Sequence, residues 1–124
     1  MRTLAIIPAR GGSKRIPNKN IRNFLGKPII AYSINTALDS DLFDEVMVST
    51  DSDMIADVAT SFGANIPFMR SGASASDNAT TVDVLIEVLT KYKEQGINFT
   101  YACCIYPTAP FISHYRLKIA LAKL

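Results

Sequence analysis

The chain has 124 residues, a formal net charge of +2 and a hydrophobic content of 48%, which are typical of one globular domain with a single core. Its longest apolar runs fall well short of the about 20 residues that a transmembrane helix needs, and Met1-Arg2-Thr3-Leu4 does not begin a signal peptide. We therefore expect a single domain over residues 1–124, located in the cytoplasm and not associated with a membrane.

The first half of the chain predicts two strands, each followed by a helix. Leu4–Pro8 is apolar on both faces, which is typical of a buried strand. Helical spacing follows over Pro28–Leu38, because proline suits a first turn and apolar residues then recur every three or four positions. Glu45–Thr50 predicts a second strand, and Asp51 or Ser52 is expected to cap the helix after it.

The second half continues the same alternation. Asn65–Met69 predicts a short third strand, followed by a loop of small and polar residues over Arg70–Asn78. Thr80–Gln95 has a strong helical pattern, Tyr101–Tyr106 predicts a fourth buried strand, and Ser113–Leu124 predicts a fourth helix.

Strands that alternate with helices of this length favour right-handed crossovers and a parallel sheet. We therefore predict an α/β fold, a three-layer Rossmann-like sandwich with a mostly parallel sheet. Ligands of such sheets bind beyond the carboxyl ends of the strands. The loops Ala9–Asn20, Arg70–Asn78 and Pro107–Phe111 should converge there.

Two features at the end of the chain suggest a missing partner. The apolar pattern of the last helix continues to Leu124, with no capping residue after it. Tyr101–Tyr106 would also lie near an open edge of a four-stranded sheet, where an apolar strand invites aggregation. We expect the chain to be the N-terminal part of a longer enzyme, or to pair with a second copy.

The turn after the first strand predicts a phosphate site. Gly11 and Gly12 allow backbone angles closed to other residues, and their amides could approach phosphate oxygens. No acidic residue occurs before Asp39, whereas seven cations do: Arg2, Arg10, Lys14, Arg15, Lys19, Arg22 and Lys27. Seven of the 11 acids then fall between Asp39 and Asp57. This asymmetry indicates a local anionic ligand rather than nucleic acid, which usually needs a cationic face with interleaved aromatic residues.

Other readings remain open at this point. The turn is neither a Walker loop nor a Gly-x-Gly-x-x-Gly loop, so it could be a solvated basic turn. Cys103 and Cys104 are neighbours that would point to opposite faces of a strand, which favours a core role over a disulfide or a metal site. Asp51 and Asp53 could suggest a metal, but helix capping explains them better. His114, the single histidine, favours a surface or capping position.

The motifs together resemble a known family. Ile7-Pro-Ala-Arg-Gly-Gly-Ser-Lys-Arg-Ile-Pro-Asn-Lys-Asn20 with Gly26-Lys-Pro28 is similar to the opening of the sugar-acid cytidylyltransferases, which include the CMP-sialic acid synthetases. Later landmarks agree: Val48-Ser-Thr-Asp51, Ile55-Ala56, Gly63-Ala64, Arg70, Ser76-Asp77 and Pro107-Thr108. Tyr106-Pro-Thr-Ala-Pro-Phe111 and the cysteine pair resemble the pseudaminic acid branch most. The resemblance implies the fold of the nucleotide-diphospho-sugar transferases.

The resemblance also implies roles for individual residues. Arg10 and Lys19 match the positions that hold the triphosphate, and we name them as the catalytic residues. The other implied substrate-binding residues are Gly11, Gly12, Ser13, Lys14 and Asn20 near the phosphates and ribose, Arg70, Ala79 and Thr81 at the cytosine, and Tyr106, Pro107 and Thr108 at the sugar acid. Cytosine presents acceptors at O2 and N3, which suit a cationic donor.

The implied reaction joins CTP to a nine-carbon keto-sugar acid (a nonulosonic acid), with pseudaminic acid favoured and sialic acid as the alternative. The family uses Mg²⁺, whose carboxylate ligands are expected outside this chain, so no metal ligand is assigned. The resemblance also implies a homodimer. A hexose-phosphate nucleotidyltransferase fits less well, because such enzymes carry a glycine-rich loop with different cations. A non-catalytic CTP-binding fragment is the alternative of another class.

Overall fold

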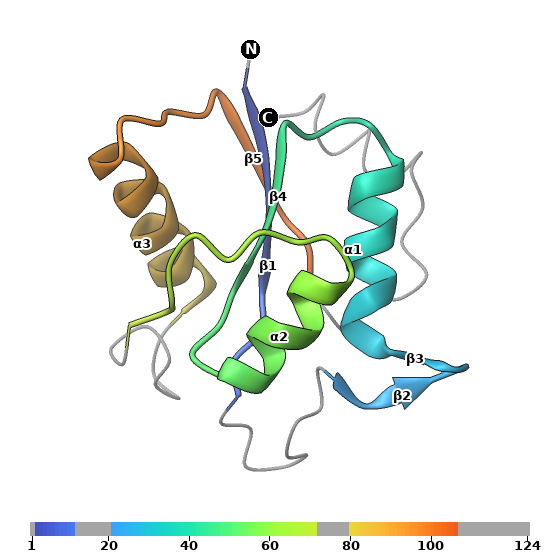
Figure 1. Ribbon diagram of the computed structural model, residues 1–124. Coiled ribbons are helices and arrows are strands. Elements are labelled where there is room, and N and C mark those ends of the chain that lie inside the picture. The colour runs from blue at the N-terminus through green and yellow to red at the C-terminus, as the bar shows by residue number, and fades with distance from the viewer. Residues whose placement is uncertain (1, 12–20, 72–79, 107–124) are drawn as a thin grey trace.

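The computed structural model describes residues 2–11, 21–71 and 80–106, which form a parallel sheet with helices on both faces (Figure 1). The strands of this sheet are β1 (Thr3–Pro8), β4 (Glu45–Ser49) and β5 (Tyr101–Cys104). The helices are α1 (Ile29–Asp39), α2 (Asp53–Ser61) and α3 (Thr81–Glu94). The predicted α/β class and these six elements are confirmed, while the helix expected at Ser113–Leu124 lies outside the described residues.

Strand β1 is the centre of the sheet, between β4 and β5, and both neighbours run parallel to it. Ala5 and Ile7 pack on one face with residues of α1 and α2, whereas Leu4 and Ile6 pack on the other face with α3. All four side chains are fully buried. The continuous apolar run of β1 is thus explained by burial on both faces, as parallel sheets require.

The strand predicted at Asn65–Met69 is wrong in extent. Only Asn65 pairs with β4, through a parallel bridge to Met47. Its N–H donates to Val46 O at 2.9 Å, and its carbonyl accepts from Val48 N–H at 3.1 Å. Pro67 has no N–H to continue this pairing. With this bridge the order across the sheet is the Asn65 segment, β4, β1 and β5. This is the strand order of one half of a Rossmann fold and part of the next.

A small hairpin precedes α1 that the sequence did not predict. Its strands β2 (Asn23–Phe24) and β3 (Lys27–Pro28) contain two residues each, too few for a periodic pattern. Leu25 and Gly26 form the turn with φ of 51° and 91°, as tight hairpins require. The Tyr32 ring of α1 packs edge-on against Phe24 at 5.7 Å, and its hydroxyl donates to Leu25 O at 3.2 Å.

Side chains cap the two helices that start at the carboxyl ends of the strands. Ser52 Oγ accepts from Ile55 N–H at 3.3 Å and begins α2, which decides the open choice between Asp51 and Ser52. Thr80 and Asp83 form a reciprocal capping box at the start of α3, with distances of 3.1 and 2.9 Å. Among the described residues, no helix is both long and apolar enough to span a bilayer.

Candidate functional site

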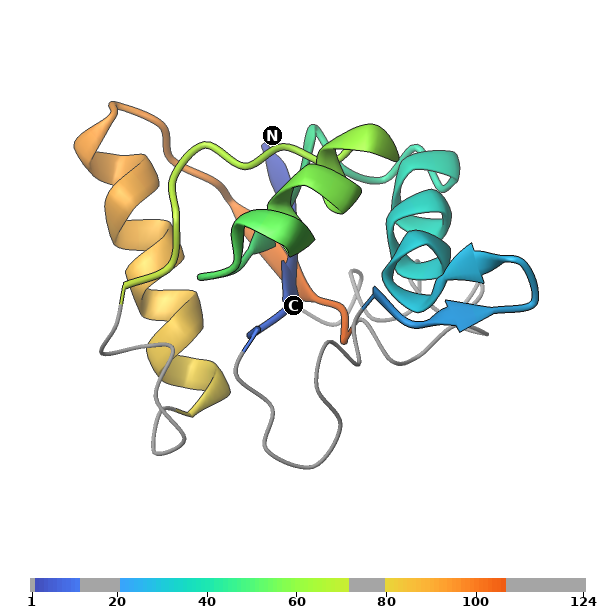
Figure 2. The same cartoon turned by 60° about the horizontal axis from the view of Figure 1, so that its bottom comes forward.

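The carboxyl ends of β1 and β4 bring two predicted site residues together. The chain leaves β1 through Ala9, whose N–H donates to Ser49 O at 2.8 Å, and continues to Arg10. Thr50, just after β4, accepts the N–H of Arg70 at 2.8 Å. Arg10 and Arg70 therefore lie on segments that both attach to the end of β4, at the lower end of the sheet in Figure 1 and the forward end in Figure 2.

Gly11 is required by a close approach. A Cβ atom on Gly11 would lie 2.8 Å from Cβ of Ser52, nearer than non-bonded carbons can come. Its φ is not positive, so the special backbone angles inferred from the sequence are not the reason for this glycine. Its N–H donates to Asp51 Oδ1 at 2.9 Å. In this structure the Gly11 amide therefore fastens the turn to the end of β4.

Arg70 is half-buried, and its environment suits an anionic or polar ligand. Its Nε is buried and has no hydrogen-bond partner among the described residues. Burial lowers the pKa of the guanidinium, and the positive charge of Arg10 lowers it further, while Asp51 and Glu87 act in the opposite direction. Two cations that repel each other, beside an unpartnered donor, form a place that a ligand with acceptor groups would stabilise.

Helix α3 holds the segment that contains Arg70. Glu87 Oε1 accepts from Ser71 N–H at 3.0 Å, and Glu87 Oε2 accepts from the Ser71 hydroxyl. One turn later, Lys91 Nζ donates to Met69 O at 3.1 Å and lies 3.9 Å from Glu87 Oε1. Neither α3 residue was among the site residues predicted from the sequence, because both contact the segment only through tertiary structure.

Tyr106 follows β5, and both its carbonyl and its hydroxyl have hydrogen-bond partners. Its carbonyl accepts from the buried hydroxyl of Ser33 in α1 at 3.1 Å. Its own hydroxyl lies 3.0 Å from Thr81 Oγ1, in the first turn of α3. The side chain is 54% exposed, so the ring is accessible to a ligand. Two residues predicted for different parts of the substrate are thus in direct contact.

The remaining predicted residues fall outside the described ranges: Gly12, Ser13, Lys14, Lys19, Asn20, Ala79, Pro107 and Thr108. Their roles stay predictions. The described residues also do not fit a Mg²⁺ ion, since no group of three or more metal-binding side chains occurs among them. Asp51, at the end of β4, already accepts the Gly11 N–H, and its charge raises the pKa of Arg70.

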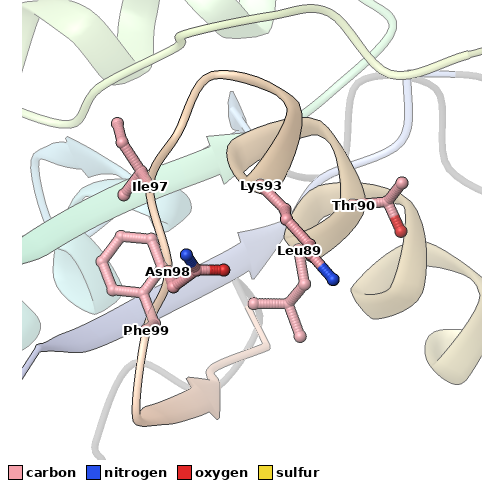
Figure 3. A pocket seen from close by; sticks show the side chains of 6 residues that line it. All are labelled: Leu89, Thr90, Lys93, Ile97, Asn98 and Phe99. Carbon is pink, nitrogen blue, oxygen red and sulfur yellow. The ribbon is translucent and has the colours of Figure 1, made fainter.

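Two hollows lie at the opposite end of the sheet. One, of about 220 Å³, is shown in Figure 3 and is lined by Leu89, Thr90, Lys93, Ile97, Asn98 and Phe99. The other, of about 300 Å³, is lined by Arg2, Asp44, Glu45, Ile97 and Phe99. Its acids have partners, because Asp44 Oδ2 accepts from Thr3 N–H at 2.7 Å and Glu45 accepts from the Tyr92 hydroxyl. Arg2 precedes β1, so these hollows are separate from the predicted site.

A parallel sheet in Rossmann order, with cations at its carboxyl end, defines a nucleotide-binding type of α/β domain. The model of the cytidylyltransferase family matches residues 4–124, and the chain belongs to this family. The predicted resemblance is thereby confirmed at the level of the family.

Relatives and solved structures agree. The chain is 46% identical over 123 residues to the pseudaminic acid cytidylyltransferase of Campylobacter jejuni, covering 99% of this chain and 53% of the relative. It is 46% identical over 111 residues to the CMP-N,N'-diacetyllegionaminic acid synthase of Legionella pneumophila, covering 90% and 48%. The structure of a CMP:2-keto-3-deoxy-manno-octonic acid synthetase in complex with CTP matches with a TM-score of 0.82 and 27% identity, over 99% of this chain and 47% of that one. The chain thus spans about half the length of these relatives.

Proposed function

We propose that this protein transfers CMP from CTP to a nine-carbon keto-sugar acid, with pseudaminic acid favoured, and releases pyrophosphate. The observation that carries the proposal is that Arg10 and Arg70 lie on two segments that are both hydrogen-bonded to the end of β4. A nucleoside triphosphate offers anionic oxygens for one cation and base acceptors for the other. Membership of the cytidylyltransferase family and the relatives at 46% identity support the same assignment.

In the proposed reaction the anomeric hydroxyl of the sugar acid attacks the α-phosphorus of CTP. A new P–O bond forms to the sugar, the P–O bond to the β-phosphate breaks, and the hydroxyl proton passes to solvent or a base. Negative charge grows on the leaving pyrophosphate, and fixed cations stabilise that charge. We assign this role to Arg10 and Lys19. A Mg²⁺ ion held by carboxylates outside this chain would neutralise further phosphate charge when bound.

Arg70 is proposed to select the base. A guanidinium can donate to the O2 and N3 acceptors of cytosine, whereas uracil presents an N–H at position 3. Thr81 and Ala79 are proposed to complete this contact. The buried, unpartnered Nε of Arg70 is a donor for which no acceptor occurs among the described residues. CTP would supply one.

There are two alternatives to the proposed reaction. Sialic acid is the alternative acceptor, because the N-acylneuraminate cytidylyltransferase of Escherichia coli is 38% identical over 113 residues. A CTP-binding protein without turnover is the second alternative. We also propose a homodimer, which sedimentation at high protein concentration would test. Location in the cytoplasm stays a prediction.

Calorimetry with CTP and UTP tests the assignment. A hydrogen bond to a charged group contributes about 1.5–3 kcal/mol, so Arg10→Ala and Lys19→Ala should each weaken CTP binding about 10- to 150-fold. Lys93→Ala, an exposed cation near the opposite end of the sheet, is the matched control and should bind CTP normally. Unchanged affinity in both site variants would refute the phosphate role.

Turnover then separates the enzyme from the binding protein. Pyrophosphate release is measured with CTP and a panel of acceptors that includes pseudaminic, legionaminic and sialic acids. Release with one acceptor identifies the substrate. CTP binding without release for any acceptor would favour the non-catalytic alternative.

A further inference from the structure

We propose that Glu87 is a positioning residue, which fixes Arg70 by binding the neighbouring Ser71 and thereby sets the preference for cytosine. This inference rests on the proposed function and deepens it. Glu87 does not touch the proposed substrate site itself. It acts through a segment whose conformation decides where the Arg70 guanidinium lies.

The first argument is the geometry around Arg70. The residue after it is bound twice by one carboxylate, through the Ser71 N–H at 3.0 Å and the Ser71 hydroxyl. The residue before it, Met69, has its carbonyl bound by Lys91 at 3.1 Å. The N–H of Arg70 itself is bound to Thr50 O at 2.8 Å. Met69, Arg70 and Ser71 are thus bound to α3 on one side and to the end of β4 on the other. These bonds fix the backbone from which the Arg70 side chain extends.

The second argument is the spacing of the two α3 side chains. Glu87 and Lys91 are four residues apart on one face of the helix, where an acid followed by a base stabilises a helix. Lys91 Nζ also lies 5.2 Å from the centre of the Phe68 ring, which extends the contact one residue further back. Both side chains are partly shielded from solvent, with exposed fractions of 33% for Lys91 and 18% for Glu87. Glu87 and Lys91 therefore bind the two neighbours of Arg70 from one helix.

The third argument is charge. Glu87 and Asp51 raise the pKa of the Arg70 guanidinium, while burial and Arg10 lower it. A negative charge on α3 therefore offsets part of the repulsion between the two cations before a ligand binds. Removing this charge should loosen Arg70 even where the hydrogen bonds to Ser71 are partly kept.

The test is a double-mutant cycle between Glu87 and Arg70, read as CTP affinity in the full chain. We expect Glu87→Ala to weaken CTP binding about 5- to 10-fold and to reduce the preference for CTP over UTP. Glu87→Gln keeps one acceptor for the Ser71 N–H but loses the charge, so its effect should be smaller. In the Arg70→Ala background, Glu87→Ala should change CTP affinity less than about 2-fold, because the residue on which it acts is gone.

Two controls separate positioning from general stability. Glu94→Ala removes an exposed carboxylate from the last residue of the same helix and should leave CTP affinity unchanged. Amide hydrogen exchange of Ser71 should quicken in Glu87→Ala without added nucleotide, whereas the buried amides of β1 should keep their protection. This second measurement remains informative if the affinity change is small.

Equal losses of CTP affinity from Glu87→Ala in the wild-type and Arg70→Ala backgrounds would overturn the inference. So would an unchanged CTP affinity in Glu87→Ala when Arg70→Ala weakens binding, and in that case the proposed function would stand. Absence of CTP binding by the wild-type protein would instead remove the proposed function, and this inference with it.

Discussion

The N–H of Gly11 donates to Asp51 Oδ1 at 2.9 Å and joins the turn after β1 to the end of β4. The residues on both sides of Asp51 have similar tasks. Thr50 O accepts the N–H of Arg70, and Ser52 Oγ caps α2. Three consecutive residues therefore anchor the turn after β1, the Arg70 segment and helix α2.

Gly11→Ala is expected to displace the turn and weaken CTP binding. The new Cβ would lie 2.8 Å from Cβ of Ser52, so either the turn or the start of α2 must move. A shift of this kind would also stretch the bond to Asp51. Calorimetry should show a loss of CTP affinity of about 10-fold or more, comparable with the loss of one charged hydrogen bond.

A second substitution provides the control for this prediction. Ser52→Gly removes the Cβ with which the new alanine would collide, and a glycine cap costs α2 only a few tenths of a kcal/mol. The double variant Gly11→Ala with Ser52→Gly should regain much of the lost affinity. Failure of this rescue, with Ser52→Gly alone binding normally, would show that the collision is not the cause.

Tyr106→Phe is expected to affect the acceptor more than the nucleotide. The change removes the hydroxyl that lies 3.0 Å from Thr81 Oγ1 and leaves the half-exposed ring less well fixed. One neutral hydrogen bond contributes about 1 kcal/mol, so KM for the sugar acid should rise about 5-fold with little change in CTP affinity. Tyr101→Phe, at the start of the strand that precedes Tyr106, is the control. An equal loss for CTP would contradict the division of roles.

Tyr92 is expected to be a main support of the α3 face of the core. It is 1% exposed and packs edge-on against Phe68 and Phe99, with ring centres 5.3 and 5.0 Å away, and its hydroxyl donates to Glu45. Tyr92→Phe should lower the free energy of unfolding by about 1 kcal/mol. Tyr92→Ala should lower it by about 3–5 kcal/mol in denaturant titrations. A smaller loss for alanine than for phenylalanine would refute this packing.

Alkaline pH is expected to destabilise the fold through Cys104. Burial, with a smaller effect of Cys103, raises the pKa of the Cys104 thiol to about 11. An unfolded cysteine loses its proton near pH 8.5. Between these values the folded chain binds more protons than the unfolded chain, so the free energy of unfolding must fall as pH rises from about 9 to about 11.

Denaturant titrations across this pH range test whether Cys104 contributes to the loss of stability. Cys104→Ala should reduce the fall but not abolish it, because the pKa values of Cys103 and Tyr92 are also raised by burial. From pH 5 to pH 7 these groups keep their protons in both states, so they should contribute almost no slope. An identical alkaline slope in the variant would exclude Cys104 as a contributor.

Most of the fold could be predicted because its signals are local. The apolar run of β1 indicated burial on both faces, and Ser52, one of the two expected candidates, caps α2. Where the prediction was wrong, a local conflict explains it. Pro67 cannot donate to the neighbouring strand, so pairing ends after Asn65. The β2–β3 hairpin is too short for any periodicity to show.

The site could be predicted only in part. The convergence of Arg10 and Arg70 follows from the rule that parallel strands place their carboxyl ends at one edge. The supporting residues follow from no such rule. Asp51 contacts Gly11 across 40 positions and Glu87 contacts Ser71 across 16, and neither spacing belongs to a motif. Asp51 was interpreted as a helix cap, whereas Ser52 has that task.

The position of the two hollows has a practical consequence for ligand discovery. Both hollows are lined by Phe99, and one is also lined by Arg2, at the amino end of β1. Strand β1 is six residues long, about 20 Å at 3.3 Å per residue, and Arg10 follows its other end. A fragment that binds in either hollow would therefore lie about one strand length away from Arg10. Soaking or screening campaigns on this protein should score competition with nucleotide, since occupancy of the Phe99 hollow reports nothing about inhibition.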